Sequence, residues 1–400
     1  MALDILKEKG TPLSQQGFNW RELVQAPISK LDDDAFTRVR IILMNGLESE
    51  MNRFLHGCAR MNAHLQKPLA LVRRVDQHQQ TLINWLIGAD HSPLETTLGF
   101  EQVAIEVTAA IAQQEPDPYL AQIFRFGLLE DFDHLYRFAA LYDRLAGGDA
   151  NNITQCYTDI RPGRPTKLEH RHPLDDLRRP YDRSKAAPIT KLNALTIMAA
   201  ENQTHDYYMT IGPQFADPVA RQLYAEIASI EEQHTTQYES IIDPHESWLE
   251  KWLMHECMEV YNYYSCVEGE SNPRIKKIWE RFLDYELGHL HFAIDIARKA
   301  DVEVEAFLPE KLPDPVKFAS QREFVRATLE AEVGYSANGT EIVKTFAEEG
   351  EDSKVYRQTV NAAGSPSETV AQGYCWTPGT ELLRRVAMEE PDLGLEKEVR

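Results

Sequence analysis

The sequence predicts an all-α protein organised as two four-helix units. Apolar residues recur at helical spacing over long runs, glycines and prolines fall at the ends of those runs, and one helical hairpin motif is repeated. The expected helices cover residues 37–63, 68–88, 98–113, 118–146, 189–211, 218–241, 245–268 and 273–299.

Four segments are expected along the chain. Residues 1–148 should form an N-terminal helical bundle that is a degenerate repeat of a second bundle at 189–300, and the second bundle should carry the functional site. Residues 149–188, rich in proline and arginine, should connect the two bundles. Residues 301–400 should form an irregular C-terminal extension with one further helical stretch near 320–332.

The connection contains two features with alternative interpretations. His170 and His172 in "LEHRHP" could bind a metal, but a solvated loop is favoured. The arginines could bind an anionic substrate or partner, but pairing with the protein's own acidic surface is favoured. They are Arg161, Arg164, Arg171, Arg178, Arg179 and Arg183.

Composition excludes several classes of protein. The net charge of −21 argues against nucleic acid or an anionic membrane as a general partner. The five cysteines form no C-x-x-C pair, so neither a zinc ribbon nor a disulfide framework is expected. No secretion signal or membrane span is recognisable, so a cytoplasmic location is predicted.

The repeated motif is a helical hairpin that carries acid-x-x-His. An Asp-Pro or Asn-Pro pair, which favours a helix start, precedes each second helix. Thirteen residues after the proline stands an acid, with a histidine three residues later, and a glutamate stands thirty residues before the acid. The three sets are Glu101, Asp131 and His134; Glu201, Glu231 and His234; and Glu256, Glu286 and His289.

A fourth copy is expected at the N-terminus, counted from Pro68. Its corresponding positions are Met51, Thr81 and Asn84, which are not metal ligands. Glu101, Asp131 and His134 would then belong to a single hairpin. A hydrogen-bonded polar cluster is therefore expected in the N-terminal half, with a single-metal site as the alternative.

In the second half, the acid and the histidine continue an apolar stripe, so they should point inward. Buried carboxylates and imidazoles at this density require cations among them. Oxygen ligands with some nitrogen favour two iron ions, or alternatively two manganese ions. Ferritin-like di-metal bundles take one glutamate from each of two helices and a Glu-x-x-His motif from each of the other two. The expected ligands are Glu201, Glu231, His234, Glu256, Glu286 and His289.

Residues 189–300 resemble the ferritin-like di-iron carboxylate proteins, and rubrerythrins in particular. The resemblance implies that Glu231 and Glu286 bridge the ions, and that Glu259, one turn after Glu256, is an exchangeable ligand. Tyrosines near the site of rubrerythrins correspond to Tyr208 and Tyr264. No rubredoxin domain follows the bundle, so an external electron donor is implied.

One position near the site has no counterpart in this resemblance. His205 follows Glu201 by one turn, and it could be an additional ligand or an outer hydrogen-bond partner. A histidine at the rim of the site is the favoured interpretation.

The expected function is that of a di-iron oxidoreductase that reduces peroxide or activates dioxygen. The extra length of the chain also indicates a small organic substrate, which the sequence does not identify. The alternatives are a ferroxidase or other iron-handling protein, and a helical scaffold without catalysis. A homodimer is one assembly that fits this class.

Overall fold

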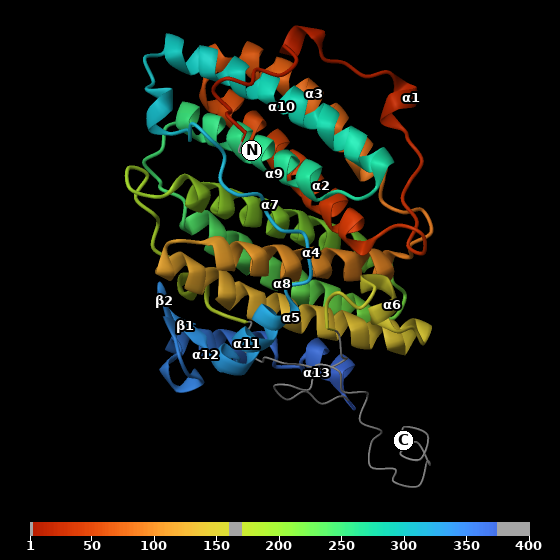
Figure 1. Ribbon diagram of the computed structural model, residues 1–400. Coiled ribbons are helices and arrows are strands. Elements are labelled where there is room, and N and C mark those ends of the chain that lie inside the picture. The colour runs from red at the N-terminus through yellow and green to blue at the C-terminus, as the bar shows by residue number, and fades with distance from the viewer. Residues whose placement is uncertain (1–2, 160–169, 374–400) are drawn as a thin grey trace.

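The computed structural model describes residues 3–159 and 170–373, and within them the protein is all-α apart from one two-stranded antiparallel sheet. Eight long helices dominate the fold (Figure 1). They are α2 (Ala35–Met61), α3 (Gln66–Asn84), α4 (Pro93–Gln114), α5 (Pro118–Ala146), α7 (Pro188–Ile211), α8 (Pro218–Ser240), α9 (Trp248–Gly269) and α10 (Pro273–Lys299). The predicted all-α class is confirmed.

Consecutive long helices pack as four hairpins: α2 with α3, α4 with α5, α7 with α8, and α9 with α10. The hairpins form a stack in which α3 and α10 lie at one end, α5 and α8 lie at the other, and the remaining four helices lie between them (Figure 1). Helices α4 and α5 contact α7 and α8, respectively, and α2 contacts α9 as well as α7 and α4. The expected bundle of residues 189–300 around one site is wrong, because its two hairpins face different partners.

The starts of the second helices confirm the capping argument. Asp117 accepts hydrogen bonds from the free N–H groups at the start of α5, Asp217 does so at α8, and Asn272 at α10. In each case proline occupies the first helical position, where its missing N–H has no cost. These common starts place the acid-x-x-His residues at the same depth in all three helices.

Helix α3 begins differently, and the predicted inner positions on it are wrong. It starts at Gln66 after a short 3₁₀ turn, and no side chain caps it. Thr81 is half-buried and Asn84 is exposed. The residues that α3 directs inward are Asp76 and Gln79, which are buried. Counting from Pro68 failed because this proline does not stand at the helix start.

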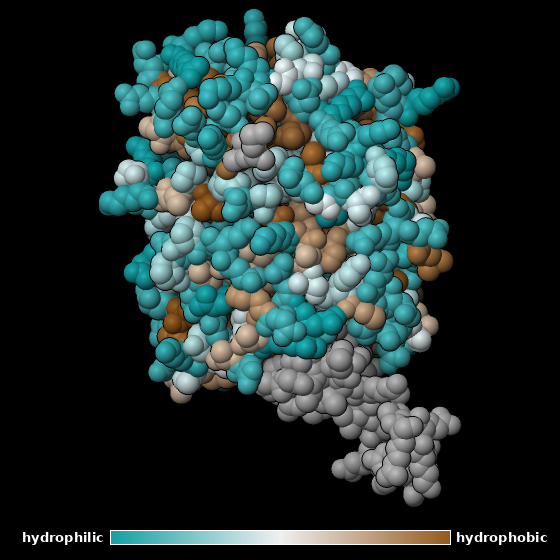
Figure 2. Space-filling model, viewed as in Figure 1, coloured by the Kyte–Doolittle hydropathy of each residue, from teal (hydrophilic) through white to brown (hydrophobic). Residues whose placement is uncertain are grey.

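Each half of the stack has an apolar core around its polar centre. Leu47, Met51, Trp252, Trp279 and Phe282 are among the buried residues of the half that contains α10. Phe132, Leu135, Tyr224 and Ile227 are among those of the half that contains α5. The face in Figure 2 is largely hydrophilic, with small separate apolar areas. In the described parts of the chain, no helix has the length and apolar character that a bilayer span needs.

The connection is more ordered than expected where it is described. It contains α6 (Ala150–Thr154), and Arg171 and Arg178 are buried. His170 is buried with its Nε2 2.9 Å from Glu226 Oε1, so the interpretation of a solvated loop is wrong for this residue. Arg161 and Arg164 lie outside the described residues.

The C-terminal extension is irregular over residues 301–321, apart from one 3₁₀ turn, but forms regular elements after that, including a helix close to the expected stretch. It contains α11 (Arg322–Glu332), β1 (Ser336–Asn338), β2 (Glu341–Val343), α12 (Glu351–Val360) and α13 (Pro366–Ala371). Helix α11 contacts α5, and α13 contacts both α5 and α8. This end of the chain therefore covers the outer face of the half that contains α5 (Figure 1). The short helix α1 (Trp20–Leu23) lies against α3 at the other end.

Candidate metal centres

The predicted ligands lie in two buried clusters rather than one. Cluster A is formed by α4, α5, α7 and α8 and consists of Glu101, Asp131, His134, Glu201, Glu231 and His234. Cluster B is formed by α2, α3, α9 and α10 and consists of Glu48, Asp76, Glu256, Glu259, Glu286 and His289. The expectation that Glu201, Glu231 and His234 share a centre with Glu256, Glu286 and His289 is wrong. The physical reason is that hairpins from opposite halves of the chain pack together.

Cluster A also corrects the expectation for the N-terminal half. Asp131 and His134 do not form an isolated polar group with Glu101, because α8 brings Glu231 between them. Together the two hairpins supply one glutamate from each first helix and acid-x-x-His from each second helix. Half of these side chains come from the hairpin that was expected to form only a polar cluster or a single-metal site.

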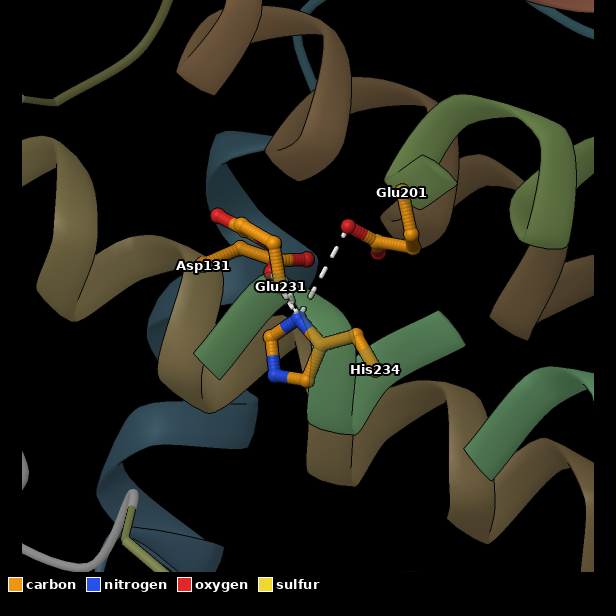
Figure 3. Close-up of side chains that lie close together, drawn as sticks. All are labelled: Asp131, Glu201, Glu231 and His234. Atoms are coloured by element: carbon orange, nitrogen blue, oxygen red, sulfur yellow. Dashed lines mark hydrogen bonds and ion pairs between the residues drawn. The ribbon is translucent and has the colours of Figure 1, made fainter. Parts of the chain in front are cut away.

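Glu231 lies at the middle of cluster A. Its Oε1 is 2.9 Å from His134 Nδ1, and its Oε2 is 3.1 Å from His234 Nδ1. Asp131 Oδ1 and Glu201 Oε2 approach the same nitrogen of His234, at 3.3 and 3.7 Å. Figure 3 shows Asp131, Glu201 and Glu231 pointing toward that nitrogen. Glu231 is thus common to two groups of ligand atoms, one with Glu101 and His134, the other with Asp131, Glu201 and His234.

A second layer of contacts fixes the orientation of His234. Its Nε2 is 2.8 Å from Glu130 Oε2, on the side of the ring away from Glu231. Glu130 is paired with buried Arg171, whose Nε donates to Asp176 Oδ1 at 2.8 Å. A carboxylate on the outer nitrogen of a metal-binding histidine holds the ring orientation and increases the basicity of the inner nitrogen. Glu130 was not singled out from the sequence, although it adjoins Asp131.

The members of cluster A are almost completely removed from water, with exposed fractions of 0–1%. Both carboxylate oxygens of Asp131 and both of Glu201 accept no hydrogen bond, and His134 Nε2 has no partner. Burial of an ionised carboxylate without a counter-charge costs several kcal/mol, on the order found for unpaired buried ions. The donor set therefore fits a pair of cations, which would occupy the positions that these atoms face.

The pKa values of the metal-free cluster also indicate that cations belong among these side chains. Burial raises the pKa of Glu231 to about 8; the hydrogen bond with His234 lowers it, and the neighbouring Glu201 carboxylate raises it. Burial also raises the pKa of Asp131 and Glu101 well above their usual values. Burial lowers the pKa of His134, so its imidazole is held neutral and able to coordinate.

Cluster B has the same construction with a different ligand set. His289 Nδ1 is 3.1 Å from both Asp76 Oδ1 and Glu286 Oε2. Glu286 is in turn close to Glu256 and Glu259 on α9. At the position that corresponds to a histidine on α5 and α8, α3 carries Gln79, whose Nε2 donates to Glu286 Oε1 at 2.5 Å.

The tyrosine predictions have different outcomes. Tyr208 is buried and donates a hydrogen bond to Glu101, so it lies beside cluster A. Tyr264 is only half-buried, unlike the members of both clusters. Its neighbour Tyr263, buried, donates to Glu48 instead. His205 is half-buried, with Nδ1 3.3 Å from Asp206 Oδ1, in agreement with a histidine at the rim.

Comparison with protein-family models, curated proteins and solved structures found no match to this chain. The assignment of a protein class therefore depends on the residues of the two clusters and on the helices that bring them together.

Proposed function

We propose that the protein is a ferritin-like di-metal carboxylate oxidoreductase whose reactive centre is cluster A. The observation that carries the proposal is that Glu231 is shared between two complete ligand groups, each with its own histidine. A carboxylate in that position can bridge two ions, and the mixture of oxygen and imidazole donors suits iron, with manganese as the alternative.

A pair of iron ions held by these residues would supply electrons for the reduction of peroxide or dioxygen. The protein's residues have separate tasks. Glu231 holds the two ion positions together, and Glu130 with Arg171 keeps His234 in one orientation. The Tyr208 hydroxyl donates to Glu101, which fixes one end of the site.

The burial of cluster A supports a small oxidant as substrate. Its six side chains are at most 1% exposed, so peroxide or dioxygen fits the site better than the organic substrate considered from the sequence. Reduction of peroxide requires two electrons, which an external donor would supply.

Metal analysis tests the proposal. Protein loaded with Fe²⁺ anaerobically should give a visible absorption change upon addition of peroxide or air. Glu231→Ala should lose about two equivalents of iron together, because one bridge serves both ions. Glu232→Ala, one position along α8 and exposed, is the matched control and should lose none. Full iron content in Glu231→Ala would refute the bridge.

The same experiment separates the iron-handling alternative. An oxidoreductase should oxidise the bound Fe²⁺ once and stop until a reductant is added. Continued oxidation of many equivalents of Fe²⁺ per chain would instead support a ferroxidase. Asp131→Ala should also lower the metal content, in contrast to the expectation for an isolated polar cluster.

A further inference from the structure

We propose that cluster B is a second, separate metal site that takes two hard divalent cations and has a different preference from cluster A. This inference goes beyond the function proposed for cluster A and does not depend on it. The residues of cluster B come from other helices, and its metal content can be measured whether or not cluster A is reactive.

The ligand atoms of cluster B form two groups with one member in common. Asp76, Glu286 and His289 offer atoms within 4.8 Å of one another, and so do Glu256, Glu259 and Glu286. Glu286 therefore has the same place in cluster B that Glu231 has in cluster A. Two ions can be accommodated, one on each side of this carboxylate.

Unpartnered buried oxygens point to cations. Glu259 and Asp76 are 0% exposed; neither oxygen of Glu259 has a hydrogen-bond partner, and Asp76 is approached only at Oδ1, by His289 Nδ1 at 3.1 Å. Cluster B holds five carboxylates and a single imidazole, so one protonated histidine could neutralise only one of them. Two divalent cations would neutralise four, which removes most of the cost of burying these groups.

The amide of Gln16 determines which nitrogen of His289 faces the carboxylates. Gln16 Nε2 donates to the carbonyl oxygens of Thr11 and Tyr285, at 2.8 and 2.9 Å. Its Oε1 therefore faces His289 Nε2, 2.6 Å away, and accepts a hydrogen bond from it. His289 Nδ1 is left toward Asp76 and Glu286, where it can hold a cation. Gln16 is thus a positioning residue for the site, supplied by the N-terminal segment.

The two clusters differ in the number of imidazoles and in their outer partners. Cluster A has two histidines, one of them backed by the Glu130 carboxylate, whereas cluster B has one histidine backed by a neutral amide. Imidazole favours iron and later metals over manganese, while carboxylates suit manganese well. Cluster B should therefore retain Mn²⁺ in competition with Fe²⁺ better than cluster A does.

Manganese binding by the full-length protein tests the inference. After the metals are removed with a chelator, equilibrium dialysis against Mn²⁺, with free ion measured by electron paramagnetic resonance, should give about four ions per chain. Glu286→Gln should bind about two fewer, while the variant of an exposed glutamate on the same helix, Glu280→Gln, should bind the full number. Wild-type stoichiometry in folded Glu286→Gln would overturn the proposal.

Two further variants keep the test decisive. If Glu286→Gln does not fold, Glu259→Gln should lose about one ion, and full binding by it would overturn the proposal equally. Gln16→Ala should weaken one Mn²⁺ by about 10–100-fold, as expected when an outer partner of a ligand is removed. Glu231→Gln should lose two different ions, so failure of cluster A and failure of cluster B give distinguishable results.

Discussion

Replacement of Glu231 by glutamine should stabilise the metal-free protein and destabilise the metal-loaded one. Glutamine preserves the shape of the side chain and an oxygen that His134 and His234 can contact, but it carries no charge. In the metal-free protein, Glu231 faces the carboxylates of Asp131 and Glu201 in a site without water. At pH 7 the folded wild type avoids this repulsion by keeping Glu231 protonated, and glutamine should remove the cost of keeping that proton.

The size of the effect follows from the pKa of Glu231, which burial raises from 4.5 to about 8. At pH 7 the unfolded chain releases this proton and the folded chain retains it, so the folded state is penalised by about 3 kcal/mol. The folded pKa is the higher one, so the penalty grows as pH rises above 4.5 and levels off above 8. At pH 5 it should be under about 1 kcal/mol.

Urea unfolding in the presence of a chelator is the appropriate assay. At pH 7, Glu231→Gln should be more stable than the wild type by up to about 3 kcal/mol, and the difference should shrink at pH 5. Addition of Fe²⁺ or Mn²⁺ should reverse the order, because only the wild type gains the full binding free energy. Exposed Glu232→Gln is the control and should change stability little under either condition. A metal-free Glu231→Gln that is less stable than wild type at pH 7 would contradict the electrostatic reasoning.

Three further predictions concern residues around the clusters. Gly288→Ala should destabilise the protein by about 1–3 kcal/mol in urea unfolding, because the added methyl group would overlap the Thr11 carbonyl oxygen. An unchanged stability would show that the N-terminal segment is not packed against Gly288. Glu130→Gln should weaken metal binding about 10–100-fold in a competition titration while preserving the fold, because it removes the negative charge beside His234 Nε2. An unchanged affinity would contradict this role of Glu130. Arg171→Met should lower the free energy of unfolding by about 3–5 kcal/mol, because it leaves the buried Glu130 without its cationic partner. An unchanged free energy of unfolding would mean that the ion pair between Arg171 and Glu130 is dispensable.

The helices themselves could be predicted from the sequence because the signals for them are local. Asp117, Asp217 and Asn272 cap helices that begin with proline, and apolar periodicity follows each of them. The same local regularity gave the acid-x-x-His positions and their inward direction, and all of the residues Asp131, His134, Glu231, His234, Glu286 and His289 are buried.

The members of cluster B on α2 and α3 were missed for an equally local reason. Glu48 and Asp76 are separated by 28 residues rather than 30, and the residue three after Asp76 is Gln79, not histidine. Because α3 starts at Gln66 without a cap, counting from Pro68 leads to Thr81 instead. Asp76 could have been predicted by searching for an acidic residue on the buried face of a helix that is followed three residues later by any polar residue.

The helical hairpins and the side chains that each one buries follow from the sequence, because capping, periodicity and spacing are properties of neighbouring residues. Which hairpins meet was decided only by the tertiary structure. Every hairpin of this repeat presents a similar polar face, so adjacent hairpins could have paired with each other as well as with distant ones. The association of α4 and α5 with α7 and α8 depends on packing between surfaces far apart in the chain, and that packing turned one expected centre into two.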